Sequence, residues 1–183
     1  MARKVSVTKE DILKAAFDVT VSEGLENATA RKVAAKAGCS TQPIFRVYRG
    51  MDEVHGEVFT MAVEDFHSFT KAYNNDSRNL PFVGLGMAYI KYAARRPELF
   101  KVLFLSENRY GKSLYEILNG ATGEVRREIE KSQKDGCRDP ETLFMRMWIC
   151  IHGMACMSLT GDNDLTEDQT RKFLEESYSV WKA

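Results

Sequence analysis

The sequence lacks several features that would define its class at once. No apolar run approaches the roughly 20 residues that a helix needs to cross a bilayer. The N-terminal segment runs into charged Lys9, Glu10 and Asp11 without the apolar core of a signal peptide. No internal repeat or low-complexity tract is present. These absences predict a cytoplasmic protein with no membrane partner.

Metal-binding patterns are also missing. The four cysteines, Cys39, Cys137, Cys150 and Cys156, form no CxxC pair, so free thiols are expected in a reducing cytosol. His152 and Cys156 lie four residues apart and could share a helix face, but two ligands fall short of the four that a zinc site needs. We therefore expect no metal and no cofactor, and we interpret His152 as a buried histidine hydrogen-bonded across helices.

Catalytic motifs are absent as well, because no Ser-His-Asp order, phosphate loop or paired carboxylates stand out. His152 and Cys156 are the candidates for chemistry in an enzyme, and helix packing explains both. The prediction is that the protein is not an enzyme. An enzyme and a helical protein-interaction adaptor are the alternatives, and whether the purified protein shifts DNA separates them from a DNA-binding protein.

Charge is balanced overall but unevenly distributed. The chain has 26 basic and 26 acidic residues, yet residues 1–50 carry nine Lys or Arg against five Asp or Glu. Residues 51–183 carry an excess of acidic residues of the same size, so a basic N-terminal segment precedes an acidic remainder. That asymmetry is typical of a protein whose basic segment binds a polyanion, and chance fluctuation is the alternative explanation.

Helical periodicity is common and strand signals are weak, which predicts an all-α fold of about nine helices. Thr8, Thr29, Ser40, Asp139 and Thr166 are suitable N-caps. Gly24 and Gly38 are natural C-terminal stops. The predicted helices run from Thr8 to Gly24, Thr29 to Gly38, Thr41 to Val47, Met51 to about Asn74, Leu80 to Arg95, Pro97 to Phe104, Lys112 to Lys134 with a break at Asn119-Gly120, Asp139 to Thr160, and Thr166 to Lys182.

The segment from Thr29 to Tyr48 has the pattern of a helix-turn-helix. Ala34 is small enough for two helices to cross closely, and Gly38 permits a sharp turn. Ser40 then caps a short helix whose N-terminal end can point at DNA, where its first side chains reach base edges.

The same residues carry a family resemblance. The pattern Ile12-Leu13-x-Ala15-Ala16, Glu23-Gly24, Thr29-x-Arg31-x-Val33-Ala34-x-x-Ala37-Gly38-x-Ser40 and Ile44-Phe45-Arg46-x-Tyr48 resembles the tetracycline-repressor (TetR) family of transcriptional regulators. The resemblance implies a homodimer in which three small helices at 1–50 bind double-stranded DNA at a near-palindromic operator. It also implies that a larger helical domain at 51–183 binds a small effector and dimerises.

Residues that face DNA follow from the resemblance. Gln42 can pair with adenine, and Arg31 or Arg46 with guanine or phosphate, while Lys4 and Arg3 could reach phosphates from an arm. Val47 and Met51 stand where the family has phosphate-contacting residues, which is the hint that favours the adaptor. Tyr48 is interpreted as core. The predicted DNA-binding residues are Lys4, Arg31, Ser40, Thr41, Gln42, Pro43, Phe45 and Arg46.

The second half has a family signature of its own. The segment Arg96-Pro97-Glu98-Leu99-Phe100 and the later Trp148-x-x-x-His152-Gly153 resemble a C-terminal domain type of this family named for a Trp-His-Gly motif. That resemblance implies a dimer made by the last two long helices, with Gly153 at the seam. The aromatic and methionine content of this half predicts a mostly hydrophobic effector, and the leading hypothesis is a repressor that this effector releases from DNA. The predicted effector-binding residues are Phe66, Met87, Tyr110, Tyr115, Leu118, Met145, Trp148 and His152.

Overall fold

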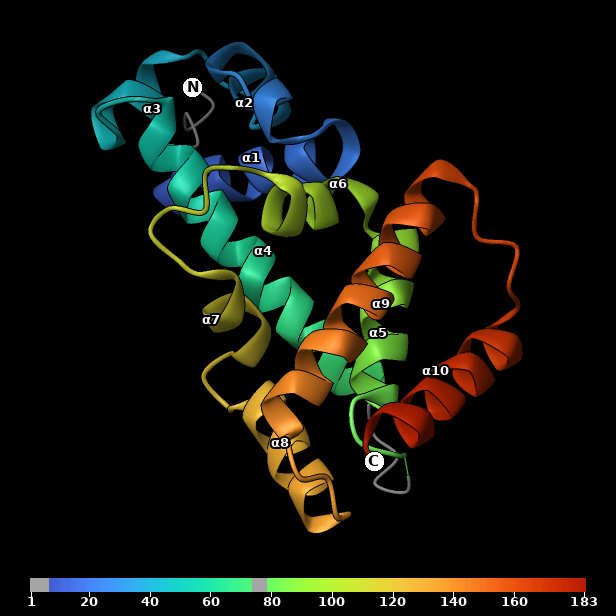
Figure 1. The fold of residues 1–183 in the computed structure, drawn as a ribbon. Coiled ribbons are helices and arrows are strands. Elements are labelled where there is room, and N and C mark those ends of the chain that lie inside the picture. The colour runs from blue at the N-terminus through green and yellow to red at the C-terminus, as the bar shows by residue number, and fades with distance from the viewer. Residues whose placement is uncertain (1–6, 74–78) are drawn as a thin grey trace. The chain divides into compact units, whose positions relative to one another are not determined.

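The computed structural model describes residues 7–73 and 79–183, and in those ranges every regular element is a helix. The predicted all-α fold is confirmed (Figure 1). Short turns follow two of the helices, a 3-10 turn η1 (Leu25–Asn27) and a π-helical turn η2 (Lys101–Leu105). The α-helices are α1 (Lys9–Glu23), α2 (Ala30–Lys36), α3 (Gln42–Val47), α4 (Met51–Tyr73), α5 (Val83–Arg95), α6 (Pro97–Phe100), α7 (Leu114–Asn119), α8 (Glu124–Lys134), α9 (Pro140–Thr160) and α10 (Glu167–Trp181).

The chain divides into two compact units. The first contains the described residues up to Asp65 together with Glu98–Gly111, and the second contains Phe66–Pro97 and Lys112–Ala183. Helix α4 therefore contributes its first turns to one unit and its last turns to the other. The domain boundary predicted after residue 50 stays a prediction.

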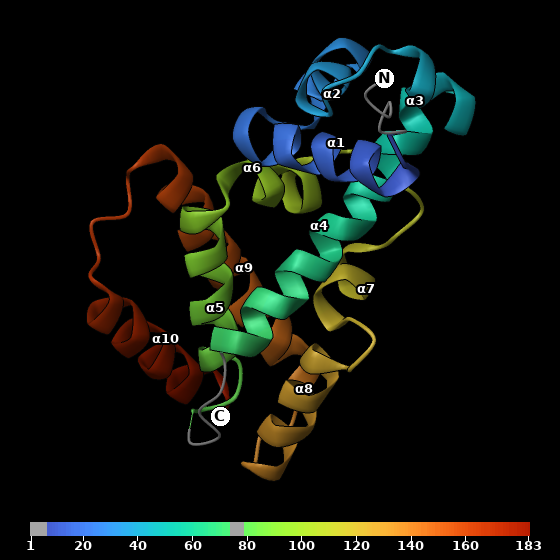
Figure 2. The same cartoon turned by 180° about the vertical axis from the view of Figure 1, so that it is seen from behind.

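The first unit is built on α1, α2, α3 and the start of α4, and Figure 2 shows α1 lying beside α2. Its core is apolar, with Ile12, Val33, Ile44 and Val54 fully buried. One residue comes from each helix, so each helix turns one stripe inward and leaves the other to solvent.

The second unit is centred on α5 and α9, which lie side by side, while α10 packs on both (Figure 1). Ten of the thirteen residues of α5 are buried. Gly86 permits the close approach of α5 to α9, because a Cβ built on it would lie 2.6 Å from Ile151 Cδ1. Helix α8 packs against α9 and α7.

Most predicted caps are confirmed. The side chains of Thr8, Thr29, Asp139 and Thr166 each accept a backbone N–H in the first turn of α1, α2, α9 and α10. The predicted cap at Ser40 is wrong, because α3 begins one residue later and Thr41 occupies the cap position without a side-chain hydrogen bond.

The start of α5 also differs from the predicted Leu80. Phe82 precedes the helix with a left-handed φ of 65°, a conformation that costs free energy for a residue with a side chain. The Glu128 carboxylate on α8 accepts the Phe82 N–H at 2.8 Å. Glu128 also receives Lys131 Nζ at 2.6 Å, so a buried carboxylate joins α8 to the first residue before α5.

Helix α9 is an exception to the prediction that no apolar segment approaches the length of a membrane span. Its 21 residues are long and apolar enough to cross a bilayer by length and composition. However, it packs against α5, α8 and α10, and its ends are capped by Asp139 and a left-handed Gly161. Those contacts are typical of the core helix of a folded helical unit.

Candidate DNA-binding helix pair and ligand cavity

The turn between α2 and α3 has the geometry of a glycine-terminated helix. Gly38 has a φ of 68°, and the following Cys39 N–H donates to Ala34 O at 2.9 Å. A glycine at this left-handed position satisfies the last carbonyls of α2 without a Cβ penalty. The chain therefore reverses within a few residues and presents the start of α3 outward.

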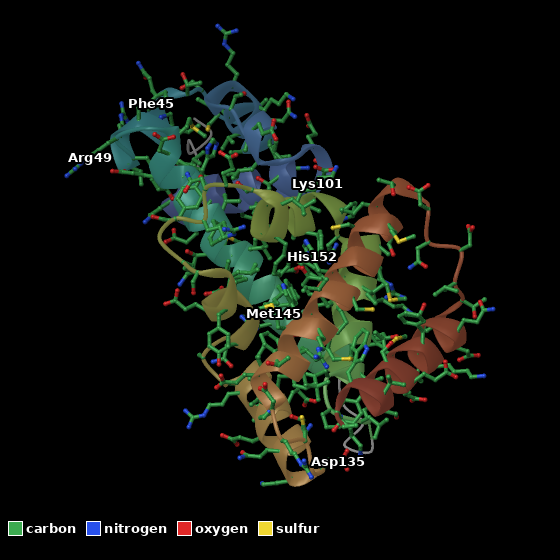
Figure 3. The ribbon with its side chains drawn as sticks, in the orientation of Figure 1. Phe45, Arg49, Lys101, Asp135, Met145 and His152 are labelled. Carbon is green, nitrogen blue, oxygen red and sulfur yellow. The ribbon has the colours of Figure 1, made fainter. Side chains whose placement is uncertain are left out.

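Helix α3 has one buried face and one exposed face. Ile44 is completely buried in the core, whereas Gln42, Phe45 and Arg46 are exposed. Phe45 is 53% exposed, and Figure 3 shows it projecting outward from α3. The side chains that the sequence predicted to face DNA are thus free to contact a partner.

Positive charge on this part of the first unit is largely uncompensated. Arg31, Lys36 and Arg46 are exposed and make no ion pair with any residue in the described ranges. Lys32, by contrast, binds Glu23 at 2.5 Å and Asn27 Oδ1 at 3.0 Å. The contrast leaves cations available for phosphates on α2 and α3.

A polar network fixes the end of α3. The Tyr48 hydroxyl donates to Glu57 Oε2 at 3.1 Å, and Lys9 Nζ binds Glu57 Oε1 at 2.6 Å. Burial and the adjacent Glu57 carboxylate raise the pKa of Tyr48, so the hydroxyl keeps its proton and remains a donor. Tyr48 is 3% exposed, which confirms its interpretation as core.

The structure brings most of the predicted DNA-binding residues together. Ser40, Thr41, Gln42, Pro43, Phe45 and Arg46 all lie in the turn and α3, and Arg31 lies on the exposed side of α2. The predicted Lys4, with Arg3, falls outside the described residues.

Arg49 was not among the predicted DNA-facing residues, although it lies directly after α3 and Tyr48. It is 95% exposed in its side chain, and Figure 3 shows it pointing away from the chain near Phe45. Its guanidinium is 3.8 Å from Glu53, a distant pairing that leaves the charge accessible.

A small cavity lies inside the second unit, between α4, α5, α7, α8 and α9, with a volume of about 30 Å³. Its wall is made of apolar side chains and five aromatic rings. The lining residues are Phe66, Phe82, Leu85, Gly86, Tyr89, Leu118, Val125, Phe144, Met147, Trp148 and Ile151.

Three of the predicted effector-binding residues line this cavity, namely Phe66, Leu118 and Trp148. Met87 is buried in α5 but does not line the cavity. Tyr115 and Met145 are exposed at 46% and 52%, and so do not contribute to the wall.

Tyr110 belongs to the other compact unit, where its ring packs on Phe59 at 5.2 Å between centroids. The cavity is also lined by residues that were not predicted to bind the effector, among them Phe82, Gly86, Tyr89 and Phe144. No spacing signal within one helix identifies them, because they become neighbours only when α5 packs on α9.

His152 lies behind the cavity wall. Its Nδ1 is 3.0 Å from the Tyr89 hydroxyl on α5, and its Nε2 is 3.6 Å from Cys156 Sγ. Burial lowers the pKa of His152 and raises that of Tyr89, so the imidazole stays neutral and the hydroxyl keeps its proton. The predicted hydrogen bond from His152 across helices is confirmed.

Exposed apolar side chains lie on both α9 and α10. Met145, Ile149 and Met157 on α9 and Phe173 and Val180 on α10 are each between 44% and 71% exposed. Gly153 lies on the same side of α9, and a Cβ built there would have no neighbour within 4 Å. Figure 3 shows Met145 on the outside of α9.

An N-terminal helix-turn-helix with uncompensated cations, followed by a helical unit with an internal apolar cavity, defines a helical DNA-binding transcriptional regulator. Residues 82–178, more than half of the chain, match the family model described as "Tetracyclin repressor-like, C-terminal domain". The chain belongs to the TetR family. No curated protein sequence matches it significantly.

Solved structures share the fold at low sequence identity. A protein described as a TetR-family transcriptional regulator from Rhodococcus sp. superposes with a TM-score of 0.66 at 16% identity, covering 95% of this chain and 98% of that one. A transcriptional regulator from Pseudomonas aeruginosa PAO1 gives 0.68 at 14% identity, covering 95% and 89%. The fatty acid degradation regulator FadR from Bacillus halodurans gives 0.57 at 14% identity, covering 96% and 98%.

Proposed function

We propose that this regulator is a cytoplasmic repressor that binds a near-palindromic operator as a homodimer and is released by a small, mostly hydrophobic effector. The observation that carries the proposal is the outward face of α3, where Gln42, Phe45 and Arg46 are exposed while Ile44 is buried. A recognition helix needs this division, because one face must hold it in the domain and the other must read DNA.

Each exposed side chain has a role in the proposal. Gln42, at the first position of α3, pairs with the hydrogen-bonding edge of adenine in the major groove. Arg46, Arg31 and Arg49 bind phosphates or guanine, and Phe45 packs against a thymine methyl group. Thr41, Ser40 and Pro43 lie around the helix start, where backbone N–H groups favour phosphate.

The homodimer is proposed to form through α9 and α10. Their exposed apolar side chains would be covered by the same face of a second copy, as a two-fold interface requires. Gly153, which has open space around it, would allow two copies of α9 to approach closely. The dimer would place two recognition helices in successive major grooves, about 34–36 Å apart.

Release by an effector is proposed to act on the population of DNA-competent dimers. A ligand that binds one arrangement of the second unit better than another shifts the equilibrium toward it. The apolar cavity lined by Phe66, Leu118 and Trp148 supports a mostly hydrophobic effector. No catalytic step is part of the proposal.

The test is a gel shift on the DNA that flanks the gene, at moderate salt, with Gln42→Ala and the matched control Gln133→Ala on exposed α8. Gln42→Ala should weaken binding to the preferred site by roughly tenfold and to variant sites by less. Gln133→Ala should change nothing. An equal loss of affinity for all DNA sequences would show that Gln42 does not read bases. A wild-type protein without sequence preference would refute the proposed repressor function.

A further inference from the structure

We propose that the cavity of the second unit takes an uncharged molecule that carries an aromatic ring and no ionised group. This inference rests on the proposed function, because it assigns a chemical class to the effector of that regulator. The observation behind it is the chemistry of the cavity wall.

The wall offers no charged side chain that could pair with an ionised ligand. Among the lining residues, all within the described ranges, there is no charged side chain and no side-chain amide. Tyr89 and Trp148 are the lining residues whose side chains carry a polar atom. An ionised group moved from water into such a wall loses its hydration without gaining a partner, which is among the most costly transfers in proteins.

The polar groups nearest to the wall are already engaged. The Tyr89 hydroxyl is 3.0 Å from His152 Nδ1, and the imidazole in turn faces Cys156. Burial raises the pKa of Tyr89 and lowers that of His152, so both stay neutral. A ligand cation or anion therefore finds no opposite charge on this side.

The buried carboxylate on α8 is engaged too. Glu128 accepts the backbone N–H of the lining residue Phe82 at 2.8 Å and Lys131 Nζ at 2.6 Å. Its charge is compensated by those two donors, so a cationic ligand would have to displace Lys131 to use it. An uncharged ligand requires no such exchange.

Aromatic side chains give the wall a preference for rings. Tyr89 and Trp148 meet at 69° with centroids 5.0 Å apart, and Phe66 and Tyr89 meet at 88° and 6.0 Å. Edge-to-face pairs of this kind add to the free energy of area burial. A ring inserted among them gains similar contacts, whereas an aliphatic chain of equal size gains burial alone.

The free space is too small for a ring as it stands. A volume of about 30 Å³ holds one or two water molecules. A ring can enter only if lining side chains move, so the ligand binds an opened arrangement and raises its population. Ligand binding is thereby tied to a change of packing between α5, α7 and α9.

The experiment compares four small probes on the full-length protein by calorimetry: methyl benzoate, benzoate, benzylamine and methyl hexanoate. Methyl benzoate should bind about 100-fold more tightly than benzoate or benzylamine, because the ions lose their hydration. It should bind about fivefold more tightly than methyl hexanoate, because the chain lacks the ring contacts. An ion that binds within about tenfold of methyl benzoate overturns the proposal.

A matched pair of variants locates the binding. Leu118→Phe adds a ring to the cavity and should abolish methyl benzoate binding, whereas Leu165→Phe makes the same change at a side chain that is 43% exposed. Circular dichroism and thermal unfolding check that both variants fold. Unchanged binding to Leu118→Phe, or no binding of methyl benzoate to the wild type, overturns the proposal.

DNA binding is measured separately on the same preparations, with and without methyl benzoate. A protein that shifts its operator but prefers benzoate refutes the ligand class and leaves the repressor intact. A protein that binds methyl benzoate but shows no preference among DNA sequences refutes the repressor and leaves the ligand class intact.

Discussion

Replacing Gly86 by alanine tests how closely α5 and α9 are packed. A Cβ at this position would lie 2.6 Å from Ile151 Cδ1, 2.9 Å from Ile151 Cγ1 and 3.3 Å from Leu174 Cδ1. Real Cβ atoms do not approach so closely, so Ile151 must move within a buried core. Overpacking of this kind costs about 1–3 kcal/mol.

Helix propensity acts in the opposite direction. Gly86 is in the interior of α5, where alanine is favoured over glycine by about 1 kcal/mol. The expected net effect of Gly86→Ala is therefore a destabilisation of up to about 2 kcal/mol. For a chain of this length, that corresponds to a lowering of Tm by up to roughly 8 °C.

The assay is urea and thermal unfolding of Gly86→Ala, Ile151→Val and the double variant. Ile151→Val removes the Cδ1 atom that the new methyl group would meet, and on its own should cost about 0.5–1.5 kcal/mol. In the double variant the alanine fills the vacated space, so the two costs should not add. A Gly86→Ala protein more stable than the wild type, or fully additive costs, would refute this account of the packing.

Gly153→Ala, on the open side of α9, tests the proposed dimer. Alanine stabilises the helix of the single chain by about 1 kcal/mol relative to glycine. If two copies of α9 meet at this position, the substitution should nevertheless raise the dimer dissociation constant measured by sedimentation equilibrium. A tighter dimer would exclude Gly153 from the seam. Burial lowers the pKa of His152 below its ordinary 6.5. Just below pH 6.5 the histidine is therefore protonated in the unfolded chain but still neutral in the folded one. The free energy of unfolding should therefore fall as pH drops below about 6.5, and His152→Gln should flatten that slope in urea titrations; an unchanged slope would contradict the assignment.

The sequence predicted the elements that depend on local interactions. Thr8, Thr29, Asp139 and Thr166 were identified as caps because capping involves only the next three residues. The break at Asn119-Gly120 was also correct, since Gly120 has a φ of 56° at the end of α7. Local chemistry was sufficient for these positions.

Positions that depend on tertiary packing could not be predicted in this way. Phe66 and Tyr110 have the same aromatic character, yet one lines the cavity and the other packs in a different compact unit. Gly86 and Phe82 acquire their roles from Ile151 and Glu128, which lie far away in sequence. Hydrophobic periodicity indicates which face of a helix is buried, but not which helix it meets.

Helix α3 has six residues, too few to be stable as an isolated helix, so its position is set by what holds it. The residue that ends it, Tyr48, is bound to Glu57 on α4, and Glu57 is bound to Lys9 on α1. The helix that is proposed to read DNA is therefore tied to the first turns of α4. In the proposed complex, a rotation of α4 about its axis would move Gln42 and Arg46 with it and would change which base pair they reach.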